Sequence, residues 1–130
     1  MEVITIISAQ LNLTAIHKGE ISASKEVRKH FKFTEGSTTV EFEASAELGD
    51  RYTLKAKRRM EEKYPKEAIA GLKTYIRAKG LVPGDRITIS KVGNEVKVFG
   101  SVFRPPLYYI HYEKAAQGGG NFAGSGAGEN

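Results

Sequence analysis

Asp50, Glu61, Glu62 and Lys63 are the residues of this chain whose types and order come nearest to a catalytic pattern. Nucleases use an acidic residue and a Glu-x-Lys triplet to hold a magnesium ion and to polarise the attacking water. That chemistry requires the Glu and the Lys on a rigid strand beside the Asp. Here they lie in a charged segment ahead of Pro65 that lacks the alternation of a strand. We therefore expect no catalytic residue in this chain.

Metal and cofactor chemistry finds as little support. The chain has no Cys, which excludes disulfides and thiolate metal sites, and neither His30 nor His111 has a Ser or Asp placed for a triad. No glycine cluster is followed by the Lys-Ser/Thr pair of a phosphate-binding loop. We expect no metal and no cofactor.

Positive charge is concentrated between residues 51 and 66. The basic residues there are Arg51, Lys55, Lys57, Arg58, Arg59, Lys63 and Lys66. Such a density attracts phosphate, Arg can bind guanine through two hydrogen bonds, and a Glu can accept from cytosine. This reasoning predicts nucleic-acid contacts from Lys57, Arg58, Arg59, Glu61, Glu62, Lys63 and Tyr64. The alternative is a solvated amphipathic face with Glu and Lys at helical spacings.

A second group of candidates follows the first predicted strand. Gln10, Asn12, Thr14, His17 and Lys18 offer both donors and acceptors of hydrogen bonds. Amide side chains suit adenine in the major groove. The two groups together predict a surface that reads a short duplex site of mixed composition.

Two predicted helices carry further positive charge. On the first, over residues 25–32, most basic residues fit an outer helix face, and only Lys25, near the helix start, is expected to bind. On the second, Lys73 and Arg77 fit either a solvated face or backbone contacts that position the nucleic acid without reading its sequence.

Strand and helix periodicities predict a mainly β chain with two short helices. Strands are expected at residues 2–9 and 20–23, a hairpin at 38–44 and 51–56, a second hairpin at 86–90 and 95–99, and at best an edge strand at 103–112. The helices are expected at 25–32 and from Ile69 to Gly80. The stretch 33–36 is echoed by 81–87, each after a helix and before a strand. This repeat predicts a seven-stranded open pseudobarrel with an internal pseudo-twofold.

The chain of 130 residues suits one domain, and its net charge of +5 is typical of proteins that bind nucleic acids. Residues 117–130 are too rich in glycine to pack, so we expect a folded unit at 1–116 and a linker to a second domain. No apolar run approaches the roughly 20 residues that span a bilayer, and the start lacks the positive region of a signal peptide. We expect a cytoplasmic protein without membrane contact.

Two segments resemble the DNA-binding pseudobarrel family. They are Gly19-Glu20-Ile21-Ser22-Ala23-Ser24-Lys25-Glu26-Val27, and Gly71-Leu72-Lys73-Thr74-Tyr75-Ile76 with Lys79-Gly80-Leu81-Val82-Pro83-Gly84-Asp85. The family comprises plant B-three transcription-factor domains and the effector domains of EcoRII-type restriction endonucleases. Leu72 stands where plant domains commonly have Trp, so this chain resembles the bacterial branch more closely.

The resemblance implies a monomer that grips the major groove of double-stranded DNA with two arms, at residues 10–18 and about 55–66. It also implies the specificity module of a prokaryotic restriction endonuclease, covalently linked to a catalytic domain.

Two other readings stay open. The stretch from Ser24 to Gly36 and the strand after it also resemble swapped-hairpin regulators of the AbrB and antitoxin kind, which would form a dimer, although this chain carries both copies of the motif. Tyr108, Tyr109 and Tyr112 would suit an RNA-binding or protein-binding module.

Overall fold

A computed structural model of the chain describes residues 3–23, 27–58, 67–93, 96–98, 102–104 and 107–115. Its elements follow in the order β1 (Val3–Gln10), α1 (Leu13–Lys18), β2 (Glu20–Ala23), α2 (Val27–His30), β3 (Thr39–Ser45), β4 (Arg51–Arg58), β5 (Glu67–Ala70), α3 (Lys73–Lys79), β6 (Arg86–Val92), β7 (Val96–Val98), β8 (Val102–Arg104) and β9 (Leu107–Glu113). The glycine-rich stretch 117–130 and the boundary near residue 116 lie outside the described residues.

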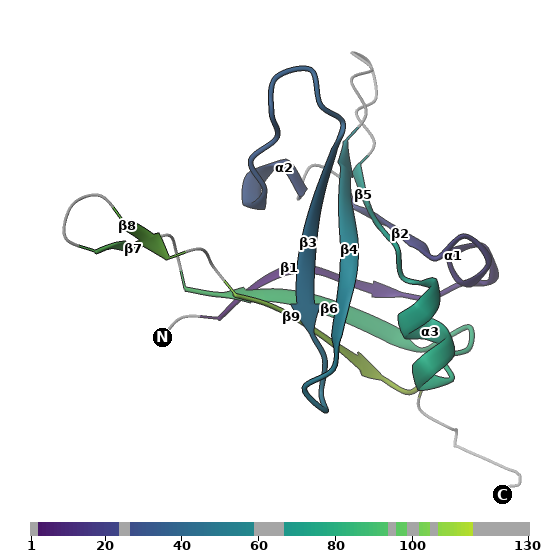
Figure 1. The fold of residues 1–130 in the computed structure, drawn as a ribbon. Helices are drawn as coiled ribbons and strands as arrows, with labels where there is room; N and C mark the ends of the chain where they lie inside the picture. Colours follow the sequence, from purple (N-terminus) through teal and green to yellow (C-terminus); the bar gives the residue numbers. More distant parts are fainter. Residues whose placement is uncertain are drawn as a thin grey trace, which may run out of the picture.

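Seven strands form one open sheet in the order β1-β6-β9-β3-β4-β5-β2. The β3–β9 pair is parallel and the other neighbours in this sheet are antiparallel. Figure 1 shows β1, β6 and β9 crossing β3 and β4 at a steep angle, so the twisted sheet wraps around its own core. The predicted mainly β, seven-stranded open pseudobarrel is confirmed.

The core fills the space between the two halves of this sheet. Alternate residues of β3, β4, β6 and β9 point inward, and α2 and α3 add residues from the two ends. The largest fully buried apolar side chains are those of Tyr75, Leu54, Ile69, Leu72, Ile87, Ile89, Ile110 and Val27. Because one face of each strand is committed to this core, the opposite face is left for other contacts.

The helix–turn–strand unit occurs twice, as the sequence predicts. One copy runs from α2 through a turn to β3, and the other from α3 through a turn to β6. In the first turn the Ser37 N–H donates to Thr34 O at 2.8 Å, and in the second the Asp85 N–H donates to Val82 O at 3.1 Å. Both copies pair within one sheet of one chain.

Two strand predictions are wrong. The expected hairpin of 86–90 with 95–99 does not form, because β6 pairs with β1 and β9, whereas β7 pairs with β8 in a separate two-stranded sheet. The expected edge strand at 103–112 is instead divided, and its second part, β9, lies inside the sheet between β6 and β3. Pro105 and Pro106 lie outside the described residues.

The helices also differ from the prediction at two places. The expected second helix begins at Lys73, because Ile69 belongs to β5 and Gly71 turns the chain with a φ of 84°. A further helix, α1, occupies residues 13–18, where the sequence analysis expects no helix. In the described part of the chain, no helix is long and apolar enough to cross a membrane.

Candidate nucleic-acid interface

The connection between β1 and β2 is a capped helix. The Asn12 Oδ1 atom accepts from the Ala15 N–H at 2.7 Å, and Gly19 ends the helix with a φ of 68°. Asn12 is one of the predicted base readers, and this hydrogen bond fixes the orientation of its amide. Its oxygen already caps α1, so Asn12 shapes this connection.

Four of the five candidates from this stretch line one hollow. Gln10, Asn12, Thr14 and Lys18 surround a space of about 240 Å³ together with Glu20 and Ser22 of β2. The Gln10 Nε2 atom donates to Gly84 O at 3.3 Å, which orients its amide. Donors and acceptors therefore converge here, and Ser22 of β2, which is not among the predicted binding residues, lies beside them.

Gly19 anchors α1 against α3. The Leu72 N–H donates to Gly19 O at 2.9 Å, and a Cβ atom on Gly19 would lie 2.8 Å from the backbone nitrogen of Lys73. Only glycine allows this approach together with a positive φ. The helix between β1 and β2 is thus held in place by backbone contacts.

A shallow floor follows the outer face of β2, β5 and β4. Its small residues are Ser22 and Ala68, which are register partners, and its cations are Lys55 and Lys57 on the exposed face of β4. Lys57 Nζ lies 3.1 Å from Glu20 Oε2, an ion pair that crosses the floor. We call this surface the β2–β5 floor. Small side chains let a large ligand approach the strands closely.

The two connections rich in candidates leave from opposite ends of the β2–β5 ladder. The β1–β2 connection ends at Glu20, which pairs with Ala70, and the β4–β5 connection ends at Glu67, which pairs with Ala23. Four residue pairs at about 3.3 Å per residue separate these ends by about 10 Å. The floor lies between them.

Arg58 stands at the last position of β4, where the second connection begins. Its Nε donates to Ser37 O at 3.1 Å, and its guanidinium carbon lies 4.6 Å from the centroid of the Phe33 ring. The side chain is therefore oriented by the turn before β3. The remaining candidates of this region, Arg59, Glu61, Glu62, Lys63 and Tyr64, lie outside the described residues, as does Lys25.

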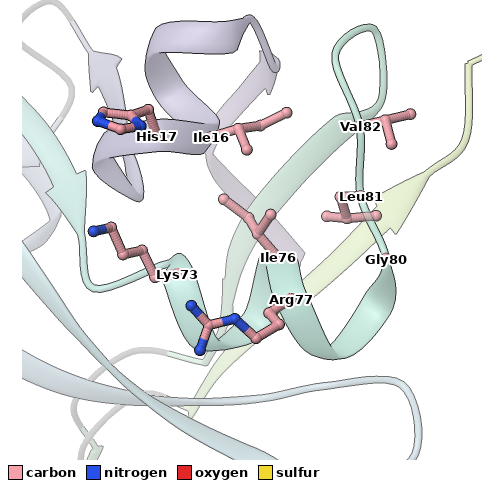
Figure 2. Close-up of a pocket in the computed structure, with 8 residues that line it drawn as sticks. All are labelled: Ile16, His17, Lys73, Ile76, Arg77, Gly80, Leu81 and Val82. Atoms are coloured by element: carbon pink, nitrogen blue, oxygen red, sulfur yellow. The ribbon is translucent and has the colours of Figure 1, made fainter.

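His17 lies on α1 beside Thr14 and Lys18, and it also faces α3. It lines an open pocket of about 530 Å³ with Lys73 and Arg77, between α1 and α3. Figure 2 shows these three side chains along one side of the pocket, with Ile16, Ile76, Leu81 and Val82 along the other. The structure thus unites residues that the sequence assigned to two different surfaces.

Asp50 has a structural role. Its Oδ2 atom accepts from the Tyr52 hydroxyl at 2.6 Å and from Lys79 Nζ at 3.1 Å. The hydrogen bond from Tyr52 and that from Lys79 lower the pKa of Asp50. This carboxylate joins the β3–β4 turn to α3, and Glu61, Glu62 and Lys63 lie outside the described residues. In the part of the chain that the structure describes, no group of three or more His, Cys, Asp or Glu is arranged to hold a metal ion.

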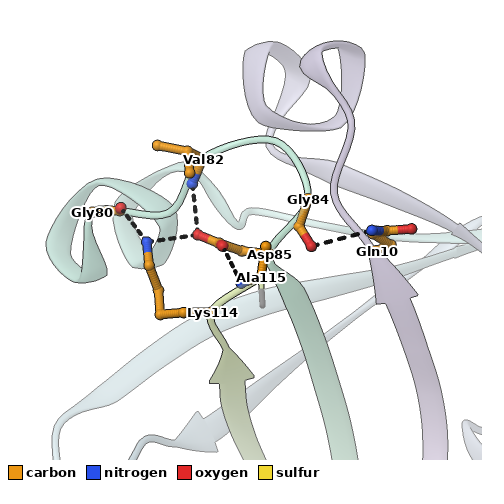
Figure 3. A network of polar contacts seen from close by, with 7 residues as sticks. All are labelled: Gln10, Gly80, Val82, Gly84, Asp85, Lys114 and Ala115. Atoms are coloured by element: carbon orange, nitrogen blue, oxygen red, sulfur yellow. Dashed lines mark hydrogen bonds and ion pairs between the residues drawn. The ribbon is translucent and has the colours of Figure 1, made fainter. Parts of the chain in front are cut away.

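Asp85, only 1% exposed, joins three parts of the chain near the first connection (Figure 3). Its Oδ2 atom accepts from the Val82 N–H at 2.9 Å and from Lys114 Nζ at 2.7 Å, and its Oδ1 atom accepts from the Ala115 N–H at 2.8 Å. The Leu11 N–H donates to Asp85 O at 2.7 Å, and Leu11 O accepts from the Gly84 N–H at 2.8 Å. The network therefore fixes the position of the backbone between the end of β1 and the start of α1.

Comparison with known proteins gives a clear result for the fold. No protein-family model and no curated protein sequence matches the chain. Among solved structures, the Arabidopsis FUS3–DNA complex matches with a TM-score of 0.64 at 14% identity, over 86% of this chain and 99% of that one. The complex of the Arabidopsis thaliana transcription factor LEC2 with DNA matches with a TM-score of 0.66 at 12% identity, over 88% and 97%. The chain therefore shares the B-three-like pseudobarrel fold of these two plant proteins.

Proposed function

We propose that this chain is a sequence-specific double-stranded DNA-binding domain that inserts its two connections into the major groove. The observation that carries the proposal is that the two connections join the sheet about 10 Å apart, at the two ends of the β2–β5 ladder. The major groove of B-DNA is about 12 Å wide. Two solved structures with this fold are complexes with DNA, which adds support.

The side chains divide the work by chemistry. Lys18, Lys55 and Lys57 are exposed cations beside or on the β2–β5 floor, and they suit phosphates. Gln10 and Thr14, at the hollow beside β2, suit base edges. Residue types assign the same reading role to Arg59, Glu61 and Glu62, phosphate contacts to Lys63 and Lys25, and stacking to Tyr64.

The cellular role that we propose is the specificity module of a prokaryotic type II restriction endonuclease. A catalytic domain would be covalently linked, and this domain would perform no chemistry itself. The resemblance of the segments around Ser22 and Leu72 to the bacterial effector domains supports this role. A monomer agrees with both helix–turn–strand units pairing in one chain, whereas a swapped-hairpin regulator takes one unit from each partner.

Salt dependence tests the proposal. We expect log Kd for duplex DNA to rise steeply with log salt concentration, since each neutralised phosphate contributes a slope of about 0.9. Lys18→Ala and Lys57→Ala should each lower that slope by about 1. Lys91→Ala, which removes the same charge near the far end of β6, should leave it unchanged. Fluorescence anisotropy measures these slopes, and equal affinity for duplex and single-stranded DNA would count against a major-groove reader.

A further inference from the structure

The pocket between α1 and α3 has a composition that points to an anionic chain. Lys73 and Arg77 are exposed and four residues apart on α3, so they share one helix face, and His17 reaches the same pocket from α1. No acidic residue is among the eight that line it. The opposite side is apolar, with Ile76 and Leu81 each 5% exposed.

The position of this pocket decides which anionic chain fits. One side of α1 contributes Thr14 and Lys18 to the hollow that borders β2, and the other side contributes Ile16 and His17 to the pocket that borders α3. An element that enters a major groove has a phosphate backbone on each flank. With α1 in the groove, as the proposed function requires, the flank toward β2 and the floor would take one strand. The other flank opens toward α3.

We infer that the pocket between α1 and α3 seats the sugar-phosphate backbone of one DNA strand just outside the base pairs that the two connections read. Lys73, Arg77 and His17 donate to the phosphates, and the apolar side lies against the deoxyribose rings. The inference rests on the proposed function and adds a contact that is independent of base sequence. It predicts that the protein contacts the DNA backbone beyond the base pairs that it reads, on the side where α3 lies.

Single neutral phosphates test this seat. The preferred binding site is first identified by selection from random duplex DNA. Duplexes that carry this site are then prepared with one phosphate at a time replaced by an uncharged methylphosphonate, and fluorescence anisotropy measures the affinity of the protein for each. We expect a few adjacent positions on one strand, outside the read base pairs, to weaken binding by the parent chain several-fold. Arg77→Ala and the milder Arg77→Gln should abolish the sensitivity at those positions and lower the salt slope by about 1, equally for selected and scrambled duplexes. Lys91→Ala should keep the full pattern.

The outcomes separate the two levels of the account. If the parent binds duplex DNA and the Arg77 variants keep its pattern of sensitive phosphates, the seat is overturned and the proposed function stands. A pocket that binds an acidic peptide in place of DNA would give this result. If the parent binds no duplex, the proposed function falls and the seat falls with it.

Discussion

Asp85→Ala is expected to lower the free energy of unfolding by roughly 2 to 4 kcal/mol, because it leaves buried backbone donors without an acceptor. The N–H groups of Val82 and Ala115 both donate to this carboxylate. Lys114→Met serves as the matched control, because Lys114 is half exposed and its loss leaves those two bonds intact. In chemical denaturation, Lys114→Met should lower the free energy of unfolding by less than half as much as Asp85→Ala does. Equal effects would mean that Asp85 stabilises the fold through its ion pair with Lys114 and not through its hydrogen bonds to the backbone.

The same carboxylate should make stability depend on pH. Burial raises the pKa of Asp85, but the hydrogen bonds from Lys114, Val82 and Ala115 outweigh it, so the pKa lies below its ordinary value of 3.8. A lowered folded-state pKa stabilises the fold above the ordinary value, and this stabilisation disappears as the pH falls through the folded-state value. Asp85→Asn, which does not titrate, should therefore show a shallower loss of stability in acid than the parent.

Gly19→Ala is expected to cost roughly 2 to 4 kcal/mol, because it adds a steric conflict to the cost of a left-handed backbone conformation. The new Cβ atom would lie 2.8 Å from the Lys73 backbone nitrogen and 2.5 Å from its Cγ atom. Gly80→Ala is a close control, because Gly80 has a φ of 63° and nothing within 4 Å of its Cβ position. Gly80→Ala should lower the free energy of unfolding by only about 1 kcal/mol, which is the cost of the left-handed backbone conformation alone.

The difference between the two glycine variants also reports on binding. Relief of the conflict at Gly19 must move α1 away from α3, which displaces Lys18 and Thr14 relative to the β2–β5 floor. Under conditions in which both variants are fully folded, Gly19→Ala should lose more affinity for duplex DNA than Gly80→Ala. Identical affinities and stabilities would show that the contact between α1 and α3 is not rigid.

Local patterns in the sequence predict the fold well where they reflect burial. The hairpin of β3 and β4 follows from the alternation around Phe42 and Leu54, and the repeat of helix, turn and strand follows from the two glycine turns. The failures are non-local. The two prolines ahead of β9 favour an edge strand at best, and nothing near Tyr108 signals that β9 pairs with β3 on one side and β6 on the other.

The candidate interface shows the same division. Gln10, Thr14 and Lys18 line one hollow because they lie close in sequence. His17 lies on the same side of the pocket as Arg77 because residues 13–18 form a helix, and the main sequence signals of that helix are the cap Asn12 and the terminal Gly19. Residue type instead favours a base-reading role for Asn12, and Gly19 begins a segment that resembles the DNA-binding pseudobarrel family. Lys55 and Ser22 reach the floor through strand pairing, which residue types alone do not reveal.

Selection from random duplex DNA tests directly whether this chain reads the sequence of DNA. The chain is bound to a library of duplexes with a randomised centre at physiological salt, and the retained molecules are amplified and sequenced over several rounds. A sequence-specific major-groove reader predicts one short enriched motif, with a cost of about 1 to 3 kcal/mol for each mismatched base pair. A retained pool that stays random while binding persists would show that the chain binds only the backbone, and would contradict the account.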